Sequence, residues 1–142
     1  MISVSAKNMK SGLQQEAMST LQATATAVKT SYDTLNNDDF YLDKNGDFMK
    51  GDYNITKHME NIDQYTDGLD TEVTLFFGDT RMVTSLVDSS GNRIIGTTAS
   101  PEVTDTVLNN GEIFTSYRTT INDKNYYCYY LPLKNSDGSI IG

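Results

Sequence analysis

Residues 73–96 read VTLFFGDTRMVTSLVDSSGNRIIG, and this stretch decides the fold. Residues 73–77 and 82–87 are rich in β-branched and aromatic side chains, which favour strands. Gly78 interrupts the pattern between them. The stretch therefore predicts two antiparallel strands, with Arg81 beside the sheet.

The strand pattern continues to the end of the chain. Residues 88–92, DSSGN, form a predicted tight turn into a third strand at 93–97. Later runs of the same character are 113–121 and the aromatic stretch 126–133. A last turn opens a strand of which residues 139–142 are present. We expect the chain to be a piece of a longer protein, severed within this strand.

Residues 1–36 contain no proline and one glycine, Gly12, and they read as one long helix. That helix is expected to stop near Asn36, whose side chain competes for backbone hydrogen bonds. One face of this helix carries an apolar stripe, and such a stripe needs an apolar partner, either the sheet of the same chain or the same helix of a second copy. Side chains at spacings of three and four make up the stripe: Leu13, Ala17, Leu21, Thr24 or Ala25, Val28, Tyr32 and Leu35.

Residues 37–71 are expected to form a loop with a short helix. Asp43, Asn45 and Asp47 resemble the first ligands of a calcium-binding loop, which also needs glycine at its sixth position and glutamate at its twelfth. This chain has Phe48 at the sixth position and no glutamate at the twelfth. An Asn-Gly turn within a short hairpin is therefore the better interpretation.

Two short helices are predicted outside the long one. The first covers residues 57–65, with Thr56 as its N-cap. His58, the single histidine, lies on it, and a lone histidine is more often a surface residue than a metal ligand. The second begins at Ser100 and Pro101, since proline is favoured at the first helical position.

Composition excludes several classes of function. The 142 residues support one modest core, and a net charge of -8 repels nucleic acid. A single cysteine, Cys128, allows no internal disulfide. No run of 18 apolar residues is present, so the chain itself is expected to be soluble.

We find no arrangement of residues in the sequence that resembles a catalytic site. Cys128 and His58 lie in unrelated segments, and neither glycine turn is followed by the Gly-Lys-Ser/Thr of a phosphate loop. The simplest interpretation of Asp79 and Asp88 is that they form turns and are charge partners for Arg81 and Arg93. We therefore expect no enzymatic activity, no cofactor and no bound metal.

Three motifs resemble a known family: KGDYNIT at 50–56, FFGDTRMVTSLVDSSGNRIIGTTAS at 76–100 and NYYCYYLPLKNSDGSIIG at 125–142. Together they are similar to the extracellular single Cache (sCache) sensor domain of bacterial methyl-accepting chemotaxis proteins. The resemblance implies an α+β, PAS-like fold, with a long N-terminal helix packed on a central antiparallel sheet, short helices and a covering loop.

Under this resemblance, residues 1–142 are one Cache-like domain: a helix at 1–36, a loop and short helix at 37–71, and a sheet at 72–142 whose last strand is truncated. The resemblance also implies membrane attachment through flanking segments absent from this chain. It places the domain outside the cell, as a homodimer through the N-terminal helix. The ligand, a small molecule such as an organic acid, is expected between the sheet and the loops that cover it.

Arg81 is the leading ligand-binding residue, because a guanidinium gives a carboxylate two parallel charge-assisted hydrogen bonds. The alternative is an ion pair with Asp79. Phe77, Ser85 and Thr97 lie on adjacent predicted strands, where they supply an aromatic wall and hydroxyl groups.

Tyrosines complete the expected site. Tyr127 and Tyr129 share one face of their strand, while Tyr126, Cys128 and Tyr130 share the other. We favour Tyr127 and Tyr129 for the pocket, because a cysteine suits a tightly packed layer; the reverse arrangement stays open. Tyr53 is expected in a lid over the site.

The expected function is therefore an extracellular ligand-binding sensor domain of a transmembrane chemoreceptor. A sensor domain of a histidine kinase is an alternative. So is a pilin-like structural subunit, which also joins a long N-terminal helix to an antiparallel sheet.

Overall fold

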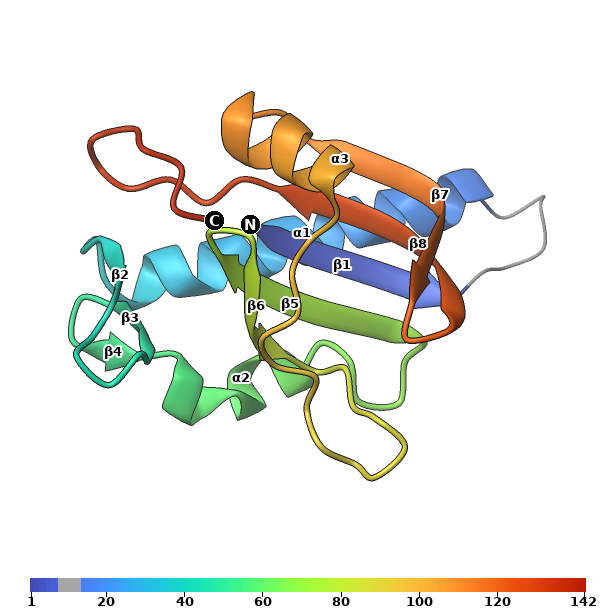
Figure 1. Ribbon diagram of the computed structural model, residues 1–142, viewed down its shortest axis with the longest axis horizontal. Helices are drawn as coiled ribbons and strands as arrows, with labels where there is room; N and C mark the ends of the chain where they lie inside the picture. Colours follow the sequence, from blue (N-terminus) through green and yellow to red (C-terminus); the bar gives the residue numbers. More distant parts are fainter. Residues whose placement is uncertain (8–13) are drawn as a thin grey trace.

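The computed structural model describes residues 1–7 and 14–142, and its centre is a five-stranded antiparallel sheet with helices on both faces (Figure 1). The strand order is β6-β5-β1-β8-β7. An antiparallel sheet of this kind with helices packed on it is an α+β fold, as predicted. The strands are β1 (Ile2–Lys7), β5 (Thr71–Phe77), β6 (Thr80–Thr84), β7 (Phe114–Ile121) and β8 (Lys124–Leu131).

β1 lies at the middle of the sheet, whereas a helix was expected over residues 1–36. Ile2 pairs with Leu75 of β5 on one side and with Leu131 of β8 on the other. Apolar and small polar residues alternate along β1, so that one face meets the main core and the other carries Ser3 and Ser5. The prediction of one long helix is wrong here, because two strand ladders satisfy this backbone better than a frayed helix end.

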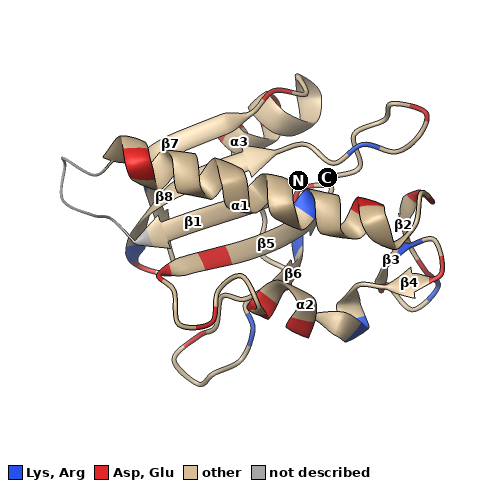
Figure 2. Ribbon diagram, turned by 180° about the vertical axis from the view of Figure 1, so that it is seen from behind, with Lys and Arg blue, Asp and Glu red and all other residues tan. Residues whose placement is uncertain are grey.

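α1 (Gln14–Leu35) crosses one face of the sheet (Figure 2). The predicted stripe is confirmed at the buried positions of this helix, although Leu35 is 51% exposed and Leu13 lies outside the described residues. The helix ends where predicted. Asn36 then donates its side-chain amide to the carbonyl of Lys50 and accepts from the amide of Asp38, at 3.0 Å each. The buried positions are Ala17, Leu21, Ala25, Val28 and Tyr32.

The sheet separates two apolar clusters. Tyr127 and Tyr129 of β8 belong to the cluster under α1. Tyr126, Cys128 and Tyr130 point the other way and join the cluster on the opposite face. The alternation of β8 therefore divides its aromatic side chains between two layers.

The opposite face is covered by α3 (Pro101–Val103) and the π-helical segment η3 (Thr104–Asn109). The helix start is confirmed: Ser100 is the N-cap, its hydroxyl accepts from the amide of Val103 at 3.3 Å, and proline follows it. Val103 and Val107 are buried against the sheet. Because α3 and η3 are short, they cover only part of this face of the sheet.

Residues 40–63 form an arm whose strands lie at one end of α1 and whose helix α2 lies beside β5 and β6 (Figure 1). It is made of β2 (Phe40–Leu42), β3 (Phe48–Lys50), β4 (Tyr53–Asn54), η2 (Thr56–His58) and α2 (Glu60–Asp63). The hairpin turn at Asn45 is confirmed, with the Asp43 carboxylate accepting from the amides of Asn45 and Asp47 at 2.8 and 2.9 Å. The Thr56 cap is not: its hydroxyl accepts from the amide of Phe48, 2.8 Å away, on a neighbouring strand.

The arm is tied to the C-terminal hairpin. The side chain of Asn135 bonds both the amide and the carbonyl of Phe40, at 2.8 and 3.0 Å. That hairpin closes through the bridge between Lys134 and Ile140. None of the helices within the described ranges is long and apolar enough to span a membrane.

Candidate functional site

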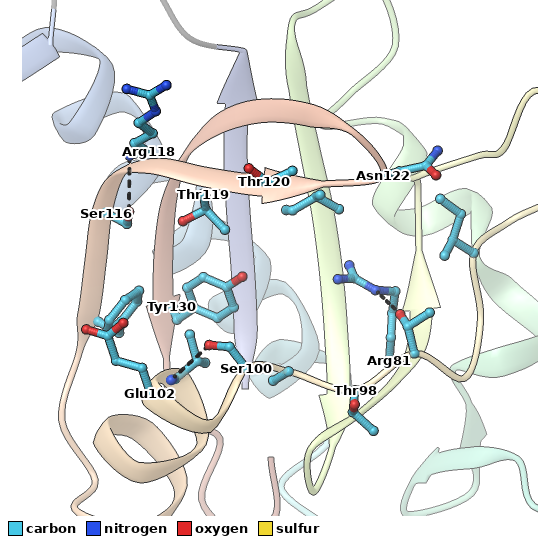
Figure 3. Close-up of a pocket in the computed structure, with 16 residues that line it drawn as sticks. Arg81, Thr98, Ser100, Glu102, Ser116, Arg118, Thr119, Thr120, Asn122 and Tyr130 are labelled. Carbon is cyan, nitrogen blue, oxygen red and sulfur yellow. Dashed lines mark hydrogen bonds between the residues drawn. The ribbon is translucent and has the colours of Figure 1, made fainter.

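A cavity of about 540 Å³ lies on the face of the sheet opposite α1 (Figure 3). Its floor includes Tyr130 of β8 and Arg81 of β6, and one wall is β7, from Phe114 to Ile121. The segment from Thr97 to Val103 forms the opposite wall, where the chain crosses from the sheet edge into α3. Cavities of this size hold small organic molecules.

Hydroxyl and amide groups make up half of the cavity lining. Apolar side chains supply most of the remainder, chiefly Phe114, Ile121 and Val103, and the charged residues Glu102 and Arg118 are exposed. Such a surface holds a ligand through hydrogen bonds more than through apolar contact. The polar side chains are Thr97, Thr98, Ser100, Ser116, Thr119, Thr120, Asn122 and Tyr130.

Arg81 is the buried cation of this cavity, with only 6% of its surface exposed. It donates from Nε to the hydroxyl of Thr97 at 3.0 Å and from Nη1 to the hydroxyl of Thr74 at 2.7 Å. The guanidinium also lies over the ring of Phe76, 4.9 Å from its centroid. All three neighbours are neutral, so they position the charge without cancelling it.

No carboxylate lies within ion-pair distance of Arg81 in the described part of the chain. Burial lowers the pKa of Arg81 from its ordinary value, because a desolvated cation without an anion is unfavourable. The expected pairing with Asp79 is absent, and that carboxylate accepts from the hydroxyl of Thr80 instead. An anion in the cavity would therefore meet an uncompensated positive charge.

Arg93 shows the contrasting arrangement. Its guanidinium donates to both carboxylate oxygens of Asp63, at 2.9 and 2.6 Å, and to the carbonyl of Thr84. Hydrogen bonding to Asp63 raises the pKa of Arg93. Asp88, the expected partner, holds its turn by accepting from two backbone amides. The two arginines of residues 73–96 therefore differ: Arg93 is paired with a carboxylate, whereas Arg81 faces the cavity.

Tyr130 and Cys128 lie on the cavity side of β8. Burial raises the pKa of Tyr130 to about 12 and that of Cys128 to about 11, while the nearby Arg81 opposes both shifts. The hydroxyl of Tyr130 points into the cavity on the side of Arg81 (Figure 3). This hydroxyl also hydrogen bonds with the side chains of Ser3 and Cys128, so it faces the cavity with part of its bonding capacity already used.

Two of the seven predicted ligand residues meet in this cavity, Arg81 and Thr97, and they are hydrogen bonded to each other. Phe77 packs edge-on against Phe48, below the other face. Ser85 bonds the backbone of Val73 and the carboxylate of Glu72. Neither of these two side chains lines the cavity.

The predicted tyrosines also lie elsewhere. Tyr127 and Tyr129 are in the core under α1, so the reverse assignment of the β8 faces describes this cavity. Tyr53 belongs to the arm, where its ring stacks on that of His58 at 5.2 Å between centroids. Tyr130 is among the lining residues that were missed, with Ser116, Thr119 and Thr120. Tyr130 pairs with Ser3 of β1, so the side of the sheet on which it lies can be predicted only when residues 2–7 are interpreted as a strand.

Metal binding has little support from side-chain geometry. Across residues 1–7 and 14–142, no group of three or more His, Cys, Asp or Glu side chains is placed to hold an ion. Asp43, Asn45 and Asp47 form the hairpin turn already described.

Comparison with known proteins gives one match. The model of the family described as single Cache domain 3 matches residues 53–142, which is more than half of the chain. The matched segment contains every residue that lines the cavity. Neither a curated protein nor a solved structure matches the chain.

Proposed function

The chain belongs to the single Cache domain 3 family, and we propose on that premise that it is the extracellular domain of a transmembrane receptor for a small carboxylate. Cache domains are ligand-binding sensor modules, and the cavity described above is a site of suitable size. The uncompensated charge of Arg81 carries the choice of an anion. A planar guanidinium matches a carboxylate with two parallel hydrogen bonds.

Two of the five N–H donors of Arg81 are directed at Thr74 and Thr97. No hydrogen bond joins the other three to a residue within 1–7 or 14–142, and we assign them to the ligand. The two threonines hold the guanidinium in one orientation. Pre-organisation of this kind reduces the entropy lost on binding. The low dielectric of a buried site strengthens the attraction between the guanidinium and an arriving carboxylate.

β8 offers a route from the ligand to α1. Its side chains alternate between the cavity, where Tyr130 lies, and the core under α1, where Tyr127 and Tyr129 lie. A displacement of this strand by a ligand would shift the packing of α1, in the manner of small helix shifts in other receptors. We assign the output to a bacterial methyl-accepting chemotaxis receptor, dimeric through α1 and anchored by flanking segments.

A histidine kinase is the alternative output, and the sequence that follows the domain in the gene distinguishes it from a chemoreceptor. The pilin-like interpretation receives no support from the family match, which is to a sensor module.

The test is a thermal-shift series with small carboxylates and with their amides as uncharged controls. A carboxylate at a hundred times its Kd is expected to stabilise the domain by about 2.7 kcal/mol. Arg81→Ala is expected to abolish this stabilisation. The matched variant Arg93→Ala removes a guanidinium that already has an acid, so it lowers the melting temperature but preserves the ligand shift. An unchanged ligand shift in Arg81→Ala would contradict the proposal.

A further inference from the structure

The cavity contains more hydrogen-bonding groups than one carboxylate can use. Arg81 stands at one end of the space, while Ser116, Thr119 and Thr120 line the wall made by β7. Tyr130 lies between them on the floor (Figure 3). These hydroxyls already have partners in the protein: Ser116 accepts from the amide of Arg118, Thr120 donates to the side chain of Asn125, Thr119 bonds Cys128, and Tyr130 bonds Ser3 and Cys128. A hydroxyl has one donor and two acceptor positions, so each keeps some capacity for the rest of a ligand whose anion is seated on Arg81.

Among the described residues that line the cavity, Arg81 is the one cation directed into it. Arg118 is exposed, and its side chain is directed away from the cavity in Figure 3. Glu102 lies across the cavity from Arg81 and disfavours a second anionic group there. The charge pattern therefore fits a ligand with one carboxylate at one end and no charge at the other.

The rest of the ligand must satisfy hydroxyls in a partly buried space. An alkyl chain would displace water from the remaining hydrogen-bonding positions of Tyr130 and Thr119 without replacing its hydrogen bonds, which is unfavourable in a partly buried space. A chain bearing hydroxyl groups would replace those bonds. Phe114 and Ile121 supply the apolar contact that the carbon backbone of such a ligand needs.

We infer that the ligand is a hydroxylated monocarboxylate, of the size and chemistry of a sugar acid, bound with its carboxylate on Arg81 and its hydroxyls along β7 and Tyr130. The inference rests on the proposed function, since it extends the carboxylate site to the whole cavity. A volume of about 540 Å³ accommodates a six-carbon acid.

Isothermal titration calorimetry on the whole chain tests the inference with three six-carbon probes: gluconate, hexanoate and sorbitol. Gluconate carries both features, hexanoate has only the carboxylate and sorbitol only the hydroxyls. Gluconate is expected to bind at least tenfold more tightly than either of the others, because hexanoate makes no hydrogen bonds to the hydroxyls of the cavity and sorbitol has no carboxylate to pair with Arg81.

Two variants locate the hydroxyl contacts. Tyr130→Phe and Thr119→Val each remove one polar group at nearly constant shape, and each is expected to weaken gluconate about tenfold without weakening hexanoate. Tyr117→Phe is the matched control, since Tyr117 is 46% exposed and packs edge-on against Tyr127 on the other side of the sheet. It should leave both affinities unchanged.

The outcomes separate the two proposals. If hexanoate binds as tightly as gluconate, the hydroxylated ligand is excluded while the carboxylate sensor stands. If sorbitol binds as tightly as gluconate, or if none of the three probes and no carboxylate of the thermal-shift series binds, the carboxylate sensor is overturned as well. Equal weakening of gluconate and hexanoate by Tyr130→Phe would assign that residue a structural role only and overturn its place in the site.

Discussion

At the scale of single residues, Arg81 illustrates a trade between stability and function. A buried charge is unfavourable unless an opposite charge accompanies it. Here hydroxyls and an aromatic face replace that opposite charge. The free energy that an internal ion pair would have contributed to folding is left for a ligand instead. Arg93, whose acid is Asp63, shows that the same fold forms such a pair elsewhere.

Cys128 predicts an alkaline loss of stability. Burial raises the pKa of its thiol from 9.0 to about 11, so the unfolded chain loses this proton first. Between about pH 9 and pH 11 the folded state therefore binds more protons, and its stability falls as the pH rises. The contribution is present in full below pH 9 and amounts to about 2 kcal/mol across this window. Chemical denaturation at a series of pH values measures it.

The control for this prediction is Cys128→Ala, which keeps every tyrosine. Tyr130, whose pKa is raised to about 12, contributes a similar loss at slightly higher pH in both proteins. The stability of the variant should therefore fall less steeply than that of the parent between pH 9 and 11. Parallel curves would show that the thiol is not shielded from water as the structure places it.

At the scale of elements, β1 occupies the middle of the five-stranded sheet. Ser5 is 2% exposed and pairs with Glu72 on one side and Cys128 on the other. Proline in a central strand removes a ladder hydrogen bond and is found only at edges or bulges. Ser5→Pro is therefore expected to lower the unfolding free energy by about 3 kcal/mol or more.

Ser5→Ala separates the backbone effect from the side-chain effect. It is expected to change the unfolding free energy by no more than about 1 kcal/mol, because β1 keeps both ladders. Hydrogen exchange gives an independent reading, since the amides of a central strand open only with global unfolding. Fast amide exchange over residues 2–7, or an unchanged unfolding free energy in Ser5→Pro, would contradict the central strand and support the helix that composition predicts for this segment.

Local patterns predicted the elements whose partners are close in the chain. The β5–β6 hairpin, the turn at Asn45, the buried stripe of α1 and the start of α3 all follow from spacing, turn residues and capping. β1 was missed although ISVSA alternates, because no proline or glycine separates it from residues with helical composition. Its partners are about 70 and 130 residues away, and no local rule reports such pairing.

The site residues also divide into those that local patterns predict and those that depend on the tertiary structure. Arg81 and Thr97 were identified because guanidinium chemistry and strand proximity are local properties. Tyr127 and Tyr129 were favoured over Tyr130, and this choice is wrong for the cavity, because alternation separates the two sets without showing which one α1 covers. Only the tertiary arrangement assigns one set to the core and the other to the cavity.

At the scale of the whole molecule, negative charge dominates the surface. The net charge is -8, and Figure 2 shows acidic residues at many places along the helices, loops and β5. Repulsion among like charges opposes the compact state. Salt shortens the range of that repulsion, with a Debye length of about 30 Å at 0.01 M and about 8 Å at 0.15 M. The melting temperature is therefore expected to rise with ionic strength, by about 3 °C over this range.

Paired charge variants determine whether net charge causes this rise. Asp52→Lys with Glu112→Lys replaces two exposed acids by bases and changes the net charge from -8 to -4, so the response to salt should shrink. Lys44→Glu with Lys124→Glu alters exposed positions in the opposite sense, to -12, and should enlarge it. Calorimetric scans of the three proteins at both ionic strengths measure the difference. An identical rise in all three would mean that salt acts on apolar burial or at a specific ion site, because neither depends on the total charge.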